Sequence, residues 1–401
     1  MRFRAVAWLL HSAGWVAATV ACSSHDRPPL LQWTTDAGGR DSGLTIRDSQ
    51  TPLPPALDAP GYCGNQIIEA VQDRPNLYLV LDRSGSMLEA LAGSSLSKYS
   101  NALGAIGNLL RTIGHRVNYA AAAFPGEPNP SGCEPGREVF SLRPGDPLSY
   151  GLSGANGPAL TELLSQLQML WPTDGGTPTS ETLNALRPEL VSLKGRTSVV
   201  LLTDGAPNCN SAARCTAEQC MPNLAGWCDP ALNCCDPSSV PPGSQLFCVD
   251  GDAAEQAVLA LSDAGIQTYV VGLPTSKNET TIEASALYTS VLDRLAIAGG
   301  TAKSTSPRYY RASDTTALGD ALRAIGVEVA VRCDIALTAP PPDPTLVNVY
   351  LDTALLEADP IDGWSWTSAT SVALRGKACE RLLAGDVLQV QVVSGCPTVV
   401  R

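Results

Sequence analysis

Between residues 76 and 326, short apolar runs alternate with segments in which apolar residues recur every three or four positions. The short runs predict strands, and the longer segments predict amphipathic helices. The six predicted strands span residues 76–82, 116–124, 137–142, 197–203, 266–273 and 308–312. One helical stripe consists of Tyr99, Leu103, Ile106, Leu110 and Ile113. This alternation predicts an α/β fold with a doubly wound, mostly parallel six-stranded sheet flanked by helices.

The pattern changes on both sides of this region. Residues 23–62 are rich in Pro, Ser, Asp, Gly and Thr, which is the composition of a flexible tether. After Gly326 the sequence turns to short strand patterns and turns without a clear helix. We expect a small disulfide-containing β module at residues 329–401, and we assign the main domain to residues 63–328.

The first residues have the features of an export signal. A basic start precedes an uncharged, mainly apolar stretch at residues 5–21, and together they predict a signal peptide over residues 1–22. The junction before Cys22 resembles a bacterial lipoprotein cleavage site, which implies a lipid on Cys22 and an anchor in the outer membrane. The alternative is ordinary cleavage near Ala21, which would release a secreted protein.

The charge balance limits the class of partner. The 401-residue chain carries a net charge of −12, which becomes more negative when the signal with its two arginines is removed. Such a surface repels nucleic acid and anionic lipid. We therefore expect no nucleic-acid partner, and membrane contact only through the lipid at Cys22. The sequence leaves the oligomeric state open.

The cysteine content agrees with export. Of 13 cysteines, an even number remains once Cys22 is set aside, which favours disulfides in an exported chain. Zinc is the alternative, but Cys-x-x-Cys spacings and nearby histidines are missing from the crowded segment. That segment contains Cys209, Cys215, Cys220, Cys228, Cys234, Cys235 and Cys248. Because this number is odd, at least one of them pairs outside the segment or stays free.

These cysteines define a predicted insertion at residues 206–250, which interrupts the strand–helix alternation. The insertion follows Asp204 directly, so we expect it to leave the same end of the sheet as that residue. It could shape a binding surface there. It could equally be a stability knot without a role in recognition.

Oxygen-bearing side chains cluster after two of the apolar runs. Asp82, Ser84 and Ser86 follow the first predicted strand, and Asp204 follows the fourth. In a doubly wound sheet these two strands are neighbours, so their carboxyl ends meet at the point where the strand order reverses. A third segment, Gly-Gly-Thr-Pro-Thr, carries Thr177. Hard oxygen ligands suit Mg²⁺, Ca²⁺ or Mn²⁺ better than Zn²⁺ or copper.

Together these segments resemble the metal-ion-dependent adhesion site of the von Willebrand factor A family. The family pattern is Asp-x-Ser-x-Ser, a later Thr, and an Asp in a Thr-Asp-Gly turn. Asp-x-Ser-x-Ser alone also fits a solvated turn, but the other two segments complete the pattern here. The resemblance covers about residues 76–326. It implies metal ligation by Asp82, Ser84, Ser86, Thr177 and Asp204.

The resemblance also implies a mechanism of binding. In the family the hydroxyls bind the ion directly and the aspartates often bind through water, so the ion stays electrophilic at an open position. An Asp or Glu carboxylate of a protein ligand fills that position. The implied function is a cell-envelope or surface adhesion protein, with Mg²⁺ as the first expectation and Ca²⁺ or Mn²⁺ as alternatives.

Two other functional classes fit the sequence less well. An enzyme is not expected, because only His25 and His115 remain after signal removal and no nucleotide-binding glycine loop follows the first strand. We interpret His115 as a cation at the end of a helix. The other alternative is a structural envelope protein, in which the metal and the disulfides only stabilise the fold.

Overall fold

The computed structural model describes residues 66–68, 74–127, 131–147, 155–238, 244–274, 282–330, 332–384, 387 and 390–401. The predicted signal peptide, the lipidation site Cys22 and the predicted tether at residues 23–62 lie outside these ranges. Within them, no helix combines the length and the apolar character that a membrane span needs.

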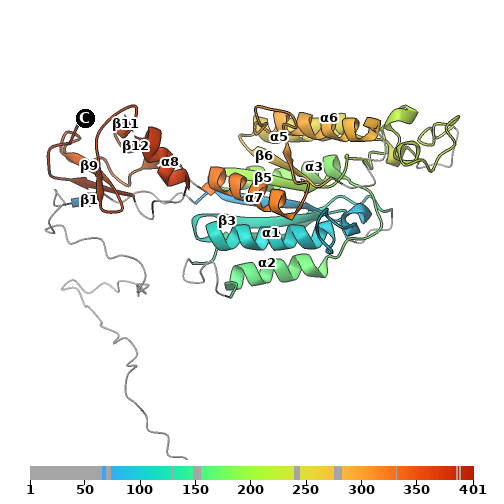
Figure 1. Cartoon of the computed structure of the whole chain (residues 1–401), viewed down its shortest axis with the longest axis horizontal. Helices are drawn as coiled ribbons and strands as arrows, with labels where there is room; N and C mark the ends of the chain where they lie inside the picture. Colours follow the sequence, from blue (N-terminus) through green and yellow to red (C-terminus); the bar gives the residue numbers. More distant parts are fainter. Residues whose placement is uncertain are drawn as a thin grey trace, which may run out of the picture. The chain divides into compact units, whose positions relative to one another are not determined.

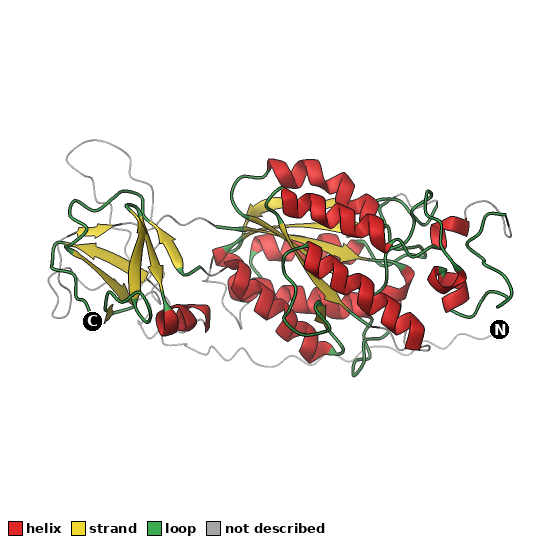
Figure 2. Cartoon of the chain, turned by 90° about the horizontal axis from the view of Figure 1, so that it is seen from above, coloured by secondary structure: helices red, strands yellow, loops and turns green. Residues whose placement is uncertain are grey.

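A six-stranded mixed sheet forms the centre of the main domain, with the strand order β4-β3-β2-β5-β6-β7 (Figures 1 and 2). Only β4 runs antiparallel to its neighbour, β3. The strands are β2 (Asn76–Asp82), β3 (Asn118–Phe124), β4 (Arg137–Pro144), β5 (Thr197–Thr203), β6 (Gln267–Gly272) and β7 (Tyr310–Arg311). All residues of β2 and β5 are buried, as expected for central strands covered on both faces. The predicted α/β fold is confirmed.

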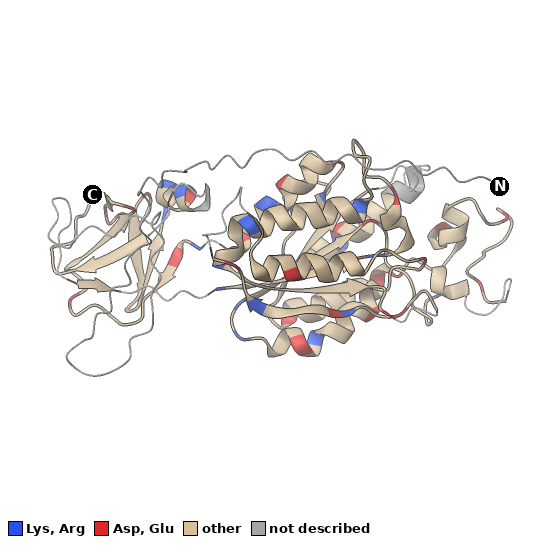
Figure 3. Ribbon diagram, turned by 90° about the horizontal axis from the view of Figure 1, so that it is seen from below, with Lys and Arg blue, Asp and Glu red and all other residues tan. Residues whose placement is uncertain are grey.

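Helices cover both faces of this sheet, because alternate residues of each buried strand point to opposite sides. Three helices pack with Leu77, Leu79 and Leu81 of β2, and the other three pack with Tyr78 and Val80. The first group is α1 (Lys98–Ile113), α2 (Pro158–Met169) and α7 (Thr315–Ala330). The second group is α3 (Thr179–Ser192), α5 (Gly251–Asp263) and α6 (Ile282–Ala298). Figure 3 shows Lys and Arg interspersed with Asp and Glu on these elements.

The C-terminal part contains two small antiparallel sheets around their own apolar cluster. One sheet has the order β1-β13-β9-β10, and the other has the order β11-β12-β8. The strands are β1 (Gln66–Ile68), β8 (Asp334–Ala336), β9 (Val347–Leu351), β10 (Ala354–Leu356), β11 (Trp364–Ser368), β12 (Ser371–Leu374) and β13 (Val390–Ser394). A disulfide joins Cys333 to Cys379.

Two features of this module correct the sequence analysis. It contains a helix, α8 (Gly376–Ala384), where only strands and turns were expected. It also includes β1, which pairs antiparallel with β13 although it precedes the main domain in the chain. The predicted main-domain range of 63–328 therefore included β1, whereas β1 pairs in the C-terminal module. A three-residue strand has no apolar pattern that identifies its partner.

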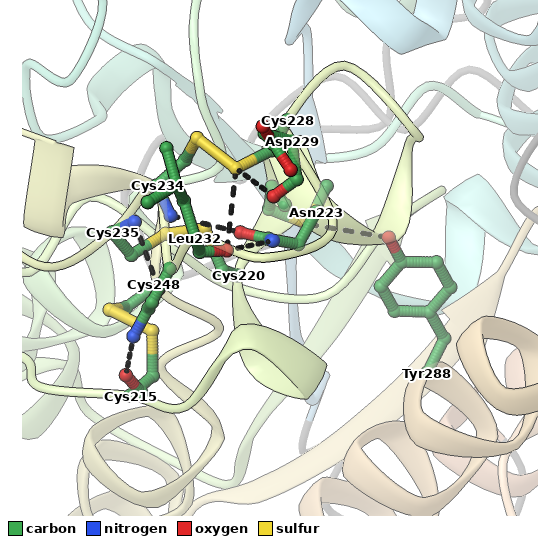
Figure 4. The surroundings of a disulfide bond; sticks show 12 residues. Cys215, Cys220, Asn223, Cys228, Asp229, Leu232, Cys234, Cys235, Cys248 and Tyr288 are labelled. Carbon is green, nitrogen blue, oxygen red and sulfur yellow. Dashed lines mark hydrogen bonds between the residues drawn. A yellow bond between two sulfur atoms is a disulfide. The ribbon is translucent and has the colours of Figure 1, made fainter. Parts of the chain in front are cut away.

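The insertion after β5 is a compact knot of disulfides (Figure 4). Its helical turns are η4 (Ala217–Gln219), α4 (Met221–Leu224) and η5 (Ser244–Phe247). The bonded pairs within it are Cys215–Cys248, Cys220–Cys235 and Cys228–Cys234. The sulfurs of Cys215, Cys235 and Cys248 lie within 4.8 Å of one another because two of these disulfides are neighbours. The preference for disulfides over zinc is confirmed.

His115 is not the helix cation that the sequence analysis expected. It lies in η2 (Gly114–Arg116), where its Nε2 accepts a hydrogen bond from Arg116 Nε at 3.1 Å. Burial, together with the positive charges of Arg116 and Arg74, lowers the pKa of His115 to about 4. The imidazole is therefore neutral at pH 7.

We expect His115→Gln to make the free energy of unfolding less dependent on pH between pH 4 and pH 6.5. The pKa of His115 rises from about 4 in the folded chain to the ordinary 6.5 on unfolding. The unfolded chain therefore binds more protons between these values, so stability is complete above pH 6.5 and falls as the pH drops towards 4. Urea unfolding at pH 4.5 and pH 7 should show a pH-dependent loss smaller by about 1–3 kcal/mol in the variant. Equal losses in the two proteins would contradict this assignment.

Candidate metal centre

Two aspartates meet at the carboxyl ends of neighbouring strands. Asp82 is the last residue of β2, and Asp204 directly follows β5. The two strands pair in parallel, with Leu81 opposite Leu202, so the residues that follow emerge side by side. Asp82 is 0 % exposed and Asp204 is 5 % exposed. Two carboxylates are thereby held in a region that solvates charge poorly.

The serines of the Asp-x-Ser-x-Ser segment connect these two carboxylates. The Ser84 amide donates to Asp82 Oδ1 at 2.8 Å, and the Ser84 hydroxyl lies 3.2 Å from the Ser86 hydroxyl. Ser86 Oγ in turn donates to Asp204 Oδ1 at 2.8 Å. Four of the five predicted ligands therefore form one hydrogen-bonded chain, which we call the Asp82–Asp204 chain.

Thr177 lies in the adjoining segment, before α3. It is buried, its amide donates to Asn208 Oδ1 at 2.8 Å, and its carbonyl accepts from the Asn208 amide at 3.0 Å. Farther back in the same segment, the Thr173 amide donates to the Arg83 carbonyl at 3.1 Å. These bonds tie the Thr177 segment to the loops after β2 and β5. The residue at the N-terminal cap of α3 is Pro178, the residue after Thr177.

A disulfide fixes the start of the insertion beside Thr177. Cys209 pairs with Cys133, which lies outside the insertion in the connection from β3 to β4. This pair accounts for the odd cysteine of the crowded segment. The Gly176 amide also donates to the Gly132 carbonyl at 2.7 Å. Cys209 has a φ of 79°, a left-handed conformation that non-glycine residues adopt only where their surroundings enforce it.

Two further residues complete the polar environment of the carboxylates. Thr203 Oγ1 donates to Asp82 Oδ2 at 2.6 Å. Lys98 Nζ lies 2.7 Å from Asp204 Oδ2 and 3.4 Å from Glu89 Oε2, and the Lys98 side chain is completely buried. Sequence analysis missed both. The one available signal was that Lys98 begins α1, where the helix dipole disfavours a cation.

The electrostatics favour an added positive charge. Burial, followed by the charge of Asp204, raises the pKa of Asp82 to about 7. Burial also raises the pKa of Asp204, although the ammonium of Lys98 opposes this shift. The side chains that converge here offer carboxylate and hydroxyl oxygens, a donor set that fits Mg²⁺, Ca²⁺ or Mn²⁺. Ser84, Ser86 and both aspartates would hold such an ion.

Comparisons with known proteins gave matches among solved structures only. No family model matches the chain, and no curated protein matches it. The pilus adhesin SpaC from Lactobacillus rhamnosus GG is 14% identical, with a TM-score of 0.45, and the match covers 82% of this chain and 40% of SpaC.

Two matches carry the family name. The vWF domain of the type V pili tip protein Mfa5 from Porphyromonas gingivalis is 12% identical, with a TM-score of 0.40, over 65% of this chain and 96% of that domain. A von Willebrand factor type A protein from Catenulispora acidiphila is 12% identical, with a TM-score of 0.36, over 81% of this chain and 59% of that protein. The part of this chain with a six-stranded sheet and helices on both faces is the α/β arrangement that the sequence pattern predicted.

We expect Gly176→Ala to disturb the site and Gly205→Ala to leave it intact, although both residues adjoin a predicted ligand. A Cβ at Gly176 would lie 2.4 Å from Asn208 Oδ1 and 2.5 Å from Cys209 Sγ, whereas a Cβ at Gly205 has no atom within 4 Å. Thermal unfolding should show a loss of about 1–3 kcal/mol for Gly176→Ala. The matched control should stay within about 0.5 kcal/mol of the unchanged protein. Similar losses in both variants would argue against a tightly packed Thr177 segment.

Proposed function

We propose that this protein is an exported binding protein whose α/β domain holds a divalent cation and presents it to a carboxylate of a protein partner. The proposed ligands are Asp82, Ser84, Ser86, Thr177 and Asp204, and Mg²⁺ is the first candidate ion. The observation that carries the proposal is the buried Asp82–Asp204 chain at the ends of two adjacent parallel strands.

The charge of the site supports an anionic ligand. When both are ionised, Asp82 and Asp204 contribute two negative charges. The buried ammonium of Lys98 offsets one of them, and Glu89 compensates part of that ammonium. The serine hydroxyls contribute no charge. A bound divalent cation would therefore keep excess positive charge, which favours an Asp or Glu side chain as its outer partner.

Exposed apolar side chains in the chain segments that adjoin the predicted ligands, and in the insertion, support a protein as the source of that carboxylate. Leu88 and Leu96 follow Ser86 in the chain. Trp171 precedes the Gly-Gly-Thr-Pro-Thr segment that carries Thr177, and Phe247 belongs to the insertion. Their exposures are 42%, 56%, 52% and 51%. Apolar groups around a polar centre are typical of protein-binding surfaces.

Export is supported by the disulfides. Five disulfides lie within the described part of the chain. Bonds of this kind persist in the periplasm or outside the cell and are rare in the cytosol. We propose that a lipid on Cys22 attaches the protein to the cell envelope. We propose no enzymatic activity and no nucleic-acid partner.

One observation favours the alternative of a structural envelope protein. Lys98, Thr203 and the two serines already give the carboxylates hydrogen-bond partners, so a bound cation could add rigidity alone. The two functions differ in what the loss of the serine hydroxyls should do. Adhesion predicts lost partner binding on a folded domain, and a structural role predicts lost stability.

The test is the double variant Ser84→Ala with Ser86→Ala, titrated calorimetrically with Mg²⁺, Ca²⁺ and Mn²⁺. The unchanged protein should bind one ion per chain, and the double variant should bind it at least about tenfold more weakly because two direct oxygen ligands are gone. Ser95→Ala, an exposed serine in the loop after Ser86, is the matched control and should titrate normally.

Circular dichroism in saturating Mg²⁺, with EDTA as the ion-free reference, separates the two functions. Under the adhesion proposal, the double variant keeps its melting temperature within a few degrees, and the loss appears only in ion binding and in capture of surface proteins. A large drop in melting temperature would favour the structural alternative. No ion binding by the unchanged protein, with or without added acetate, would contradict the metal site itself.

A further inference from the structure

Lys98 carries its positive charge in an unusual position, inside the protein. The side chain is 0 % exposed, although burying an ammonium costs free energy unless it is well paired. It begins α1, after the Ser97 cap, so the positive end of the helix dipole adds to the cost. Such a residue is expected only where its charge has a specific use.

The partners of this ammonium belong to the candidate metal centre. Lys98 Nζ lies 2.7 Å from Asp204 Oδ2 and 3.5 Å from the Ser86 carbonyl. Ser86 Oγ donates to the other Asp204 oxygen. Both oxygens of Asp204 are therefore engaged, one by a neutral hydroxyl and one by a full positive charge.

The ammonium therefore opposes a cation bound at the same carboxylate. Two positive charges that share one buried aspartate repel each other strongly, because little water lies between them to screen the interaction. Glu89 offsets part of this repulsion, since its Oε2 lies 3.4 Å from Lys98 Nζ. Glu89 is nearer to the surface, with 27% of its side chain exposed, and compensates less than a buried group would.

We propose that Lys98 lowers the resting affinity of the site for its divalent cation and thereby makes retention of the ion depend on an incoming carboxylate. The inference rests on the proposed function. An anionic ligand supplies the negative charge that Lys98 offsets, so the ion and the ligand each strengthen the binding of the other. Lys98 is in this sense a positioning residue of the site, because it contacts the ligand residue Asp204 and not the partner.

The test titrates the full chain with Mn²⁺ in two buffers of equal ionic strength, one containing acetate as the carboxylate and one containing chloride only. Lys98→Met removes the charge and keeps much of the side-chain volume. Lys98→Gln removes the charge and keeps a hydrogen-bond donor for Asp204, in case the methionine variant does not fold. Lys98→Arg keeps the charge and is the matched control. Circular dichroism in EDTA establishes that each variant is folded.

In chloride, the two uncharged variants should bind Mn²⁺ at least about tenfold more tightly than the unchanged protein. Acetate should strengthen binding severalfold in the unchanged protein and in Lys98→Arg, and by less than about twofold in the uncharged variants. A purely structural lysine would not change this response to acetate.

The two ways of failing are distinguishable. If the unchanged protein binds Mn²⁺ and the folded uncharged variants bind it equally or more weakly, the role of Lys98 is wrong and the metal site stands. If neither the unchanged protein nor any folded variant binds Mn²⁺ in either buffer, the proposed function fails and the inference fails with it. Binding by the uncharged variants alone would support the inference in its strongest form.

Discussion

The parallel register between β2 and β5 is the constraint on which the candidate site depends. β2 ends at Asp82 and β5 ends one residue before Asp204, so the pairing of Leu81 with Leu202 determines where both carboxylates emerge. Both strands are buried throughout, and a slip by one residue would turn each side chain to the opposite face of the sheet. The apolar core thus fixes the position of two acids that are far apart in the sequence.

The buried position of Asp82 and Asp204 is unfavourable for their charged forms. Burial raises the pKa of both Asp82 and Asp204, which means that their charged forms are destabilised by the surroundings. Hydrogen bonds from Ser84, Ser86 and Thr203 recover only part of the lost hydration. A fold that needed only stability would be better served by apolar side chains there. Retaining two buried carboxylates with their own hydroxyl partners is the arrangement expected of a cation-binding site.

The sequence predicted those parts of the fold and of the candidate site that a pattern of neighbouring residues marks. The sheet followed from apolar runs, and the convergence of Asp82 with Asp204 followed from the strand order of a doubly wound fold. Lys98 and Asn208, and the role of Thr203 within its Thr-Asp-Gly turn, could not be found in this way, because these roles come from contacts with distant residues. The same reason explains β1, whose three residues pair with β13, more than 300 residues later in the chain.

The insertion shows how a segment with little core of its own can still be rigid next to the site. Its buried cluster consists of Cys220, Cys235 and Cys248, so disulfides replace the apolar packing that a segment of this size lacks. Figure 4 also shows the Tyr288 side chain of α6 beside it, where the hydroxyl lies 3.3 Å from Met221 Sδ. The insertion starts within a few residues of Asp204, and Asn208 there holds the amide of Thr177. The disulfide-bonded insertion is therefore hydrogen-bonded to the segment that carries the fifth predicted ligand, and the rigidity of one supports the geometry of the other.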